Sequence, residues 1–388
     1  MNNNEKFALK IVLYLLIVAA TLFIGFCLLF MVAFAGTGDF YPIVVLISVF
    51  LLLVLIMFQM FLLKKSKYMK RAWIGFFSLL LVSCGIHEGR NAYDRNILRI
   101  QENAVDLNLY APFVDKTKAA SLAETSTLKL ESDLPRLDGA TALYPLYAAF
   151  AQAVYPQKMY SLYKSEVACN NTVSAYKSLI DREVDIIFVA PPSKAQLEMA
   201  AEAEVAFRYT PIGKEAFVFF VNARNPVESL SVEQLQGIYS GEITNWKEVG
   251  GKNEPIRAFQ RNENSGSQTA FRYFMEGKEI MTPPQNDIVR AMAPIISHTA
   301  DYTNYSNAIG FSFRFYANEM VGNKGIRLLK INGIYPATET IKDNTYPLAS
   351  QFFAVSLADN DKANVLELLE WITSEQGQYL VEKTGYSY

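Results

Sequence analysis

The chain has 388 residues, a formal net charge of −2 and 51% hydrophobic residues. Its length exceeds that of one typical domain, so we expect two globular units or one two-lobed unit. The small net charge excludes nucleic acid as the expected partner, because proteins that bind nucleic acids carry a clustered basic face. With two histidines and three cysteines in the whole chain, we expect neither a metal ion nor another cofactor.

The N-terminal part of the chain is strongly apolar. Residues 11–34 and 40–63 are each 24 residues without a charge, which is long enough to cross a bilayer as a helix. A third uncharged stretch covers 72–86, and it can be extended to 68–86 if the neighbouring basic side chains reach the headgroup region. We therefore predict a membrane anchor over 1–86 with three spans, 11–34, 40–63 and 68–86.

The basic residues of the anchor predict its orientation. Lys6 and Lys10 precede the first span, five basic residues lie at positions 64–71, and the loop at 35–39 has none. The positive-inside rule places the N-terminus and the basic loop in the cytoplasm. After three crossings the rest of the chain is outside, so we predict a multi-pass cell-membrane protein with its soluble domain on the extracytoplasmic face.

The third apolar stretch has a second interpretation. The basic segment before it, its short apolar run and the sequence Leu81-Val82-Ser83-Cys84 resemble a bacterial lipoprotein signal. Cys84 would then carry a lipid. Such signals normally open a chain instead of following two spans, so a plain third span is favoured, and Cys84 is kept as an alternative lipidation site.

The sequence beyond the anchor changes character at Thr127. Residues 87–126 are polar and aperiodic, which predicts a stalk of limited order. After Thr127, short apolar runs such as 185–190 and 215–221 alternate with helical patterns, and 362–384 has the pattern of one long closing helix. This alternation predicts an α/β domain with largely parallel sheets. In such sheets ligands gather at the carboxyl ends of the strands.

Three of the expected helix starts have no acidic residue in the first turn. They are the segments 141–143 (Thr-Ala-Leu), 172–174 (Thr-Val-Ser) and 265–267 (Ser-Gly-Ser). Most helices favour Asp or Glu there, because the N-terminus carries about half a positive charge. Ordinary capping by a hydroxyl explains each start taken singly. A bound anion held by backbone N–H groups explains all three together.

The third of these starts has further features of an anion site. Gly266 lets a ligand approach the backbone closely. Arg261, just upstream, can supply a charge-assisted, forked contact to an oxyanion. Glu263 can pair with Arg261 and thereby orient its guanidinium.

From about Leu134 to its end, the chain resembles the extracytoplasmic phosphate-binding proteins of bacterial ABC importers, which are periplasmic-binding-protein-like (type II). The segments that carry the resemblance stand in family order; they are 137–151, 238–251 ("IYSGEITNWKEVGG"), 261–271 ("RNENSGSQTAF"), 307–313, 346–353 and 374–386. The resemblance implies a two-lobed (Venus-flytrap) solute-binding fold with an anion in the cleft. We expect lobe 1 to comprise 127–222 and 311–388, and lobe 2 to comprise 223–310.

The resemblance also assigns the ligand-binding positions, which coincide with the three acid-free helix starts. Thr141 and Ala142 fall where the family's first loop offers a hydroxyl and a backbone N–H, and Thr172 falls near the hydroxyl of the second loop. The family's basic residue and its Ser-Gly-Thr sequence correspond to Arg261, Ser265, Gly266 and Ser267.

One departure from the family concerns the choice of anion. Phosphate binders usually place an aspartate after the strand that corresponds to "DIIF", where it accepts the proton of hydrogen phosphate. Residues 189–193 read Val-Ala-Pro-Pro-Ser and contain no carboxylate. Phosphate remains the first expected ligand, followed by another oxyanion or a small organic anion. The implied function is a membrane-tethered solute-binding protein that delivers this anion to an ABC permease and carries out no catalysis.

Two other function classes are compatible with the sequence. A membrane-bound anion sensor or scaffold would keep the binding fold without transport. A penicillin-binding-type serine acyl-transferase would use Ser161 and Lys164 for nucleophilic attack and Lys383-Thr384-Gly385 to bind a carboxylate. The last tripeptide ends a helical pattern, so we expect Gly385 to be a helix C-cap, and the enzyme interpretation is disfavoured.

Overall fold

The computed structural model describes residues 3–34, 40–62, 67–96, 99–100, 105–261, 263–282, 302–320 and 325–388. The chain divides into two compact units, of which the N-terminal one ends at Ile97 and the C-terminal one begins at Leu98.

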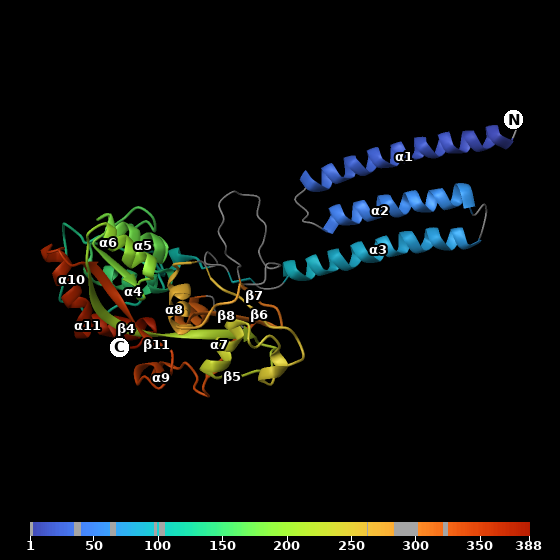
Figure 1. Cartoon of the computed structure of the whole chain (residues 1–388). Helices are drawn as coiled ribbons and strands as arrows, with labels where there is room; N and C mark the ends of the chain where they lie inside the picture. Colours follow the sequence, from blue (N-terminus) through green and yellow to red (C-terminus); the bar gives the residue numbers. More distant parts are fainter. Residues whose placement is uncertain are drawn as a thin grey trace. The chain divides into compact units, whose positions relative to one another are not determined.

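The N-terminal unit consists of three helices, α1 (Asn3–Phe34), α2 (Phe40–Met57) with its continuation η1 (Phe58–Leu62), and α3 (Lys67–Asn96) (Figure 1). All three contain a segment that is long and apolar enough to cross a membrane. Large apolar side chains such as Phe23 and Leu81 are exposed on this unit, as expected for helices whose solvent is lipid. Cys84, the alternative lipidation site, lies within α3.

The predicted stalk is wrong over most of its length. Its first ten residues, 87–96, complete α3. Residues 105–126 pack on the C-terminal unit, where Tyr110 and Ala119 are buried in its first core. The backbone N–H of Phe113 donates to Gln152 Oε1 over 3.2 Å. The sequence pattern was misleading because this segment has no regular period and contributes only single apolar side chains to the core.

The C-terminal unit is built on a mixed seven-stranded sheet, not the largely parallel one expected (Figure 1). The strand order is β2 (Leu137–Gly139), β3 (Ile186–Val189), β11 (Ala349–Leu357), β4 (Phe207–Asn222), β8 (Ala308–Phe313), β6 (Arg257–Ala258), with β9 (Ile326–Leu328) also paired to β4. The pairs β2–β3 and β6–β8 are parallel. The long strands β4 and β11 are antiparallel to each other, and β4 is also antiparallel to β8.

The remaining elements are short strands and the helices that cover the sheet. Two separate two-stranded sheets pair β1 (Arg99–Ile100) with β7 (Tyr302–Thr303) and β5 (Ser229–Leu230) with β10 (Lys330–Ile331). The helices are η2 (Leu107–Tyr110), η3 (Thr141–Leu143), α4 (Tyr144–Val154), α5 (Asn171–Ile180), α6 (Lys194–Glu202), α7 (Val232–Ser240), η4 (Trp246–Val249), α8 (Gly266–Phe274), η6 (Tyr316–Met320), α9 (Thr338–Lys342), α10 (Ala363–Thr373) and α11 (Glu375–Thr384).

The first lobe is a sheet with helices on both faces. Ile186 and Phe188 of β3 belong to the core formed with α4, α10 and α11, whereas Ile187 and Val189 belong to the core formed with α5. Successive strand residues point to opposite faces, so a strand buried on both sides must be apolar throughout. The run "IIFV" meets this requirement, and the prediction of a two-lobed α/β domain is confirmed.

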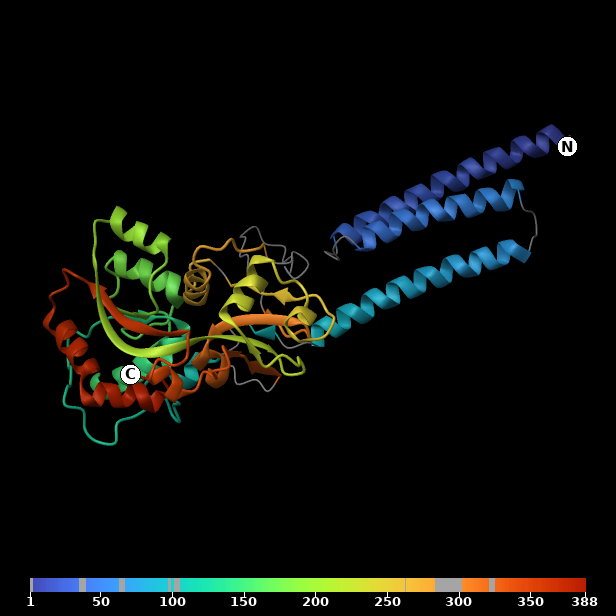
Figure 2. The same ribbon diagram turned by 60° about the horizontal axis from the view of Figure 1, so that its bottom comes forward.

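The second lobe has its own core, which is larger than the sequence suggested. Its residues run from Ala216 on β4 to Tyr346 before β11, and they include Ile341 of α9. The expected return to the first lobe at residue 311 is therefore too early, and we place the return in β11. Figure 2 shows β4 continuing from one lobe to the other. Residues 283–301 of the expected lobe 2 lie outside the described residues.

The closing helix is also interrupted. The segment 362–384 forms α10 and α11, which are separated at Ser374, where the backbone is extended. A Cβ on Gly377 would lie 2.2 Å from the carbonyl oxygen of Ile372, so glycine permits this tight junction.

Candidate functional site

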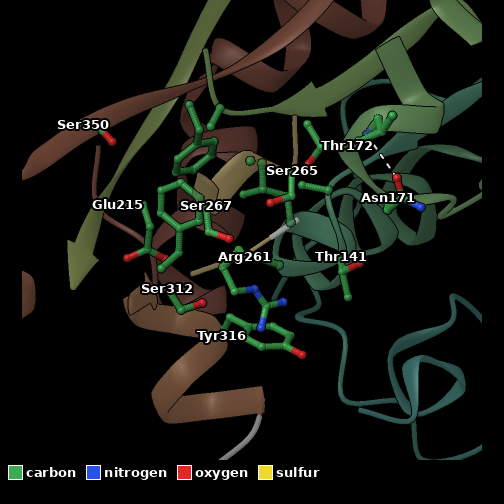
Figure 3. Close-up of a pocket in the computed structure, with 18 of the residues that line it drawn as sticks. Thr141, Asn171, Thr172, Glu215, Arg261, Ser265, Ser267, Ser312, Tyr316 and Ser350 are labelled. Atoms are coloured by element: carbon green, nitrogen blue, oxygen red, sulfur yellow. Dashed lines mark hydrogen bonds between the residues drawn. The ribbon is translucent and has the colours of Figure 1, made fainter. Parts of the chain in front are cut away.

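A pocket of about 360 Å³ lies between the two cores of the C-terminal unit (Figure 3). It is lined by residues of both lobes and of the strands that join them; the polar ones are Thr141, Asn171, Thr172, Ser174, Glu215, Arg261, Glu263, Ser265, Ser267, Ser312, Ser350 and Gln351. All seven residues predicted to bind an anion are in this lining, namely Thr141, Ala142, Thr172, Arg261, Ser265, Gly266 and Ser267. The structure thus brings them together, and their binding of an anion remains a prediction.

Asp138, a buried carboxylate, ties the two first-lobe loops of the pocket to each other. Its Oδ1 accepts hydrogen bonds from the backbone N–H groups of Gly139, at 2.7 Å, and Asn170, at 2.8 Å. Its Oδ2 accepts from the side-chain amide of Asn170 at 2.9 Å. Burial raises the pKa of Asp138, and these hydrogen bonds act in the opposite direction. The end of β2, which leads to Thr141, is therefore fixed to the start of α5, which carries Thr172.

Replacing Asp138 by alanine should both destabilise the protein and weaken anion binding. One buried and two half-buried donors would lose their acceptor, which we expect to lower the free energy of unfolding by about 3 kcal/mol. Thr141 and Thr172 would no longer be held in a fixed relative position, which should weaken phosphate binding by roughly tenfold. Denaturant unfolding and calorimetry measure the two effects. Asp138→Asn, which retains one carbonyl oxygen, should lose less in both, and an unchanged unfolding free energy in Asp138→Ala would contradict the assigned role.

Two of the backbone N–H groups at the start of α5 are already hydrogen-bonded within the same segment. Asn171 adopts a left-handed backbone conformation with φ of 70°, and its Oδ1 accepts from the N–H groups of Val173 at 3.0 Å and Ser174 at 3.2 Å. The helix begins one residue earlier than expected. These two N–H groups are capped locally, so Thr172 is the residue of this start that remains suited to a ligand.

The start of α8 combines a cap with further donors. Ser265 Oγ accepts from the N–H of Gln268 at 3.3 Å, as in ordinary capping. Gln268 Oε1 in turn accepts from the N–H of Arg261 at 2.9 Å, which fixes the loop before the helix. The first-turn N–H groups of Gly266 and Ser267 have no carbonyl acceptor within a helix. Phe271 of α8 stacks on Phe311 of β8 with ring centroids 4.4 Å apart, which holds the helix in place.

The starts of α8 and α5 face each other across the pocket. A Cβ on Gly266 would lie 3.2 Å from Thr172 Oγ1. Beside the pocket the lobes are also in direct contact, because Gln196 Nε2 donates to the carbonyl of Asn264 at 3.2 Å and Tyr273 Oη donates to the carbonyl of Pro192 at 2.8 Å. The facing helix starts that were inferred from sequence are therefore adjacent in space.

Glu263 is ion-paired with Arg272, and its predicted orientation of Arg261 remains a prediction. It lines the pocket, but its Oε1 and Oε2 accept from Arg272 at 2.6 and 2.9 Å. Arg272 lies two turns into α8 and approaches the loop that holds Glu263 from the outside of the protein. Both side chains are more than half exposed, so the pair adds less than about 1 kcal/mol to stability. Its main effect is to compensate the negative charge of Glu263 beside the pocket.

A family model described as the PBP superfamily domain matches residues 130–376. The chain belongs to this superfamily. The phosphate-binding protein PstS of Borreliella burgdorferi is 28% identical over 200 residues, which are 50% of this chain and 68% of that protein. Protein SphX of Synechococcus elongatus is 24% identical over 279 residues, which are 69% of this chain and 81% of that protein. An ABC-type phosphate transport receptor from Vibrio cholerae aligns in structure with a TM-score of 0.46 and 19% identity, covering 65% of this chain and 98% of that one.

Among the pocket residues that sequence reasoning missed in this PBP superfamily chain is a buried acid, Glu215. Its side chain is only 5% exposed. Oε1 accepts from the N–H of Ala216 at 2.9 Å and Oε2 from the N–H of Phe315 at 3.2 Å. Burial raises the pKa of Glu215 to about 7, against the lowering effect of these hydrogen bonds and of Arg314. The only signal was an acidic residue at the start of the expected strand 215–221, a position that usually faces solvent.

The buried Glu215 should make the stability of the protein depend on pH. Its pKa rises from 4.5 to about 7 on folding, so the folded state retains a proton that the unfolded chain releases between these values. This contribution to the free energy of unfolding is complete below pH 4.5 and is lost as pH rises to 7, by about 3 kcal/mol. The melting temperature of Glu215→Gln relative to wild type should therefore be higher at pH 8 than at pH 5. An equal difference in melting temperature between the two proteins at both pH values would contradict this.

The acyl-transferase residues do not form a site in this PBP superfamily chain. Lys383 and Thr384 lie in α11, and Gly385 is its left-handed C-cap with φ of 113°, as expected. The strand that such enzymes require is therefore a helix here. Ser161, Lys164 and Lys383 are outside the pocket lining. Within the part of the chain that the structure describes, no group of three or more potential metal ligands occurs.

Proposed function

We propose that the protein is a membrane-tethered, extracytoplasmic solute-binding protein that captures phosphate or a similar oxyanion for an ABC importer. The observation that carries the proposal is the approach of Gly266, at the start of α8, to Thr172, at the start of α5, beside the pocket that contains Arg261. Helix N-termini attract anions through their N–H groups and their dipole. Arg261 adds a full charge and a forked donor.

Closure of the two lobes would signal that an anion occupies the pocket. An anion in the pocket would contact Thr141 and Thr172 from the first lobe and Arg261, Ser265 and Ser267 from the second. Such contacts exist together only when the lobes are closed, so the ligand shifts the equilibrium towards closure. We infer that an ABC permease recognises the closed form, and that the three apolar helices keep the receptor at the membrane.

Membership in the PBP superfamily and the names of the relatives support phosphate as the ligand. PstS of Borreliella burgdorferi is named a phosphate-binding protein and is 28% identical to this chain. Residues 189–193 contain no carboxylate, so we expect weaker discrimination against other tetrahedral oxyanions than a binder that has the usual aspartate.

Isothermal titration calorimetry on the full chain in detergent micelles tests the proposal. Phosphate and arsenate should bind with the same stoichiometry of one per chain, and sulfate should bind more weakly. Small carboxylates such as acetate, which lack the tetrahedral arrangement of oxygens, should give no measurable heat. Absence of binding by all three tetrahedral anions would refute the proposed function.

A further inference from the structure

The pocket has a second end that differs in chemistry from the anion site. In Figure 3, Glu215, Ser312 and Ser350 lie on the opposite side of Arg261 from Thr141 and Thr172. The lining also includes four aromatic side chains, Phe313, Tyr316, Phe352 and Tyr386. Ser312 and Ser350 offer hydroxyl donors at this end, but Glu215 and the phenylalanine rings offer none, so an inorganic oxyanion would meet a carboxylate and apolar surface there.

The size of the pocket also exceeds the needs of a single inorganic anion. Its volume of about 360 Å³ falls within the range of sites for small organic molecules, about 300–1,000 Å³. Such sites combine apolar walls with a few converging polar groups. The combination of a cationic end and an end with a buried acid and aromatic rings is typical of a site for an organic ligand with two charges.

Glu215 lies in the pocket and forms no ion pair within 4 Å with any cationic side chain that the structure describes. Arg314, whose charge acts on Glu215 and lowers its pKa, directs its guanidinium to the carbonyl of Gly385 and to Thr338 Oγ1, each at 3.4 Å. The two hydrogen bonds that Glu215 accepts come from backbone N–H groups, and each carboxylate oxygen has a second lone pair. A buried carboxylate in such surroundings favours a cation beside it.

We propose that the pocket accepts an alkyl phosphate or phosphonate that carries an ammonium group. The oxyanion would lie at Arg261 and the start of α8, and the ammonium group at Glu215 among the rings of Phe313, Phe352 and Tyr386. Aromatic faces attract cations and would add to the carboxylate's attraction. This inference rests on the proposed function, because it uses the same anion site, and it names a more specific class of ligand.

A purely structural role for Glu215 makes a different prediction. Its hydrogen bonds join β4 to the backbone just after β8, and they would serve to hold the strands whether or not a ligand has an amine. In that case, ligands with and without an ammonium group should bind equally well. The preference between two matched ligands therefore separates the two roles without any mutation.

Calorimetry on the full chain in detergent micelles provides the test. The probes are 2-aminoethylphosphonate, ethylphosphonate and inorganic phosphate; the C–P bond of the phosphonates prevents release of free phosphate. We expect wild type to bind 2-aminoethylphosphonate at least tenfold more tightly than ethylphosphonate. In Glu215→Gln the two phosphonates should bind with equal affinity, because the neutral amide has no charge to attract the ammonium group.

The matched control is Glu319→Gln, which removes a neighbouring negative charge from an exposed residue outside the pocket lining. It should keep the preference for the amine. Equal binding of the two phosphonates to wild type, or a preference that persists in Glu215→Gln, would overturn the inference while phosphate binding upholds the proposed function. If neither phosphate nor the phosphonates bind to wild type, both proposals fail.

Discussion

Arg261→Ala is expected to weaken phosphate binding by roughly 150-fold, or about 3 kcal/mol, without unfolding the protein. Arg261 lines the pocket from the loop before α8, where its own backbone is fixed by Gln268. Truncation would remove the only full positive charge among the described residues that line the pocket. The hydrogen bond that fixes the loop uses the backbone N–H of residue 261, so alanine retains it. Calorimetry with phosphate measures the loss, and circular dichroism checks the fold.

Two further variants make this prediction specific. Arg182→Ala removes the same charge from an exposed pair with Asp359 and should leave phosphate affinity unchanged. Arg261→Lys keeps the charge but loses the planar fork, so it should fall between wild type and Arg261→Ala. Unchanged phosphate affinity in Arg261→Ala would refute the assignment of the site.

Gly266→Val should abolish measurable closure around the anion. Even a methyl group at this position would lie 3.2 Å from Thr172 Oγ1, and the branched side chain of valine extends further towards the first lobe. We expect the lobes to be held apart and phosphate binding to weaken by at least thirtyfold, or about 2 kcal/mol. Gly266→Ala should lose much less, because a shift of a few tenths of an ångström relieves its contact.

Small-angle scattering with and without phosphate gives an independent readout for the Gly266 variants. Wild type and Gly266→Ala should become more compact when phosphate is added, whereas Gly266→Val should not respond. Tight phosphate binding by Gly266→Val would show that the starts of α8 and α5 do not share a ligand.

The elements that form the anion site were accessible from sequence because their signals are local. The apolar run 185–190 contains β3, and the acid-free segments 141–143 and 265–267 lie at the starts of η3 and α8. A helix start that avoids acids is a property of a few adjacent residues. One such start is explained by ordinary capping, and only the occurrence of three indicated a bound anion. The fold places all three starts at one pocket.

The features that were missed depend on contacts between distant segments. Ala216 and Tyr346 share the second core although 130 positions separate them, so no local pattern revealed where the chain returns to the first lobe. Tyr110 is buried because α4 offers it a surface, and the segment around it has no regular apolar period that would have predicted this. Glu215 is an ordinary charged residue in sequence, and it enters the pocket because β4 continues through both lobes.

A crystal structure of the protein grown with arsenate tests the central claim most directly, because arsenic can be located by its anomalous scattering. We predict one strong peak in the pocket between Arg261, Thr172 and the first turn of α8. A peak only at another site, or an arsenate-bound structure in which the starts of α5 and α8 point away from each other, would contradict the account.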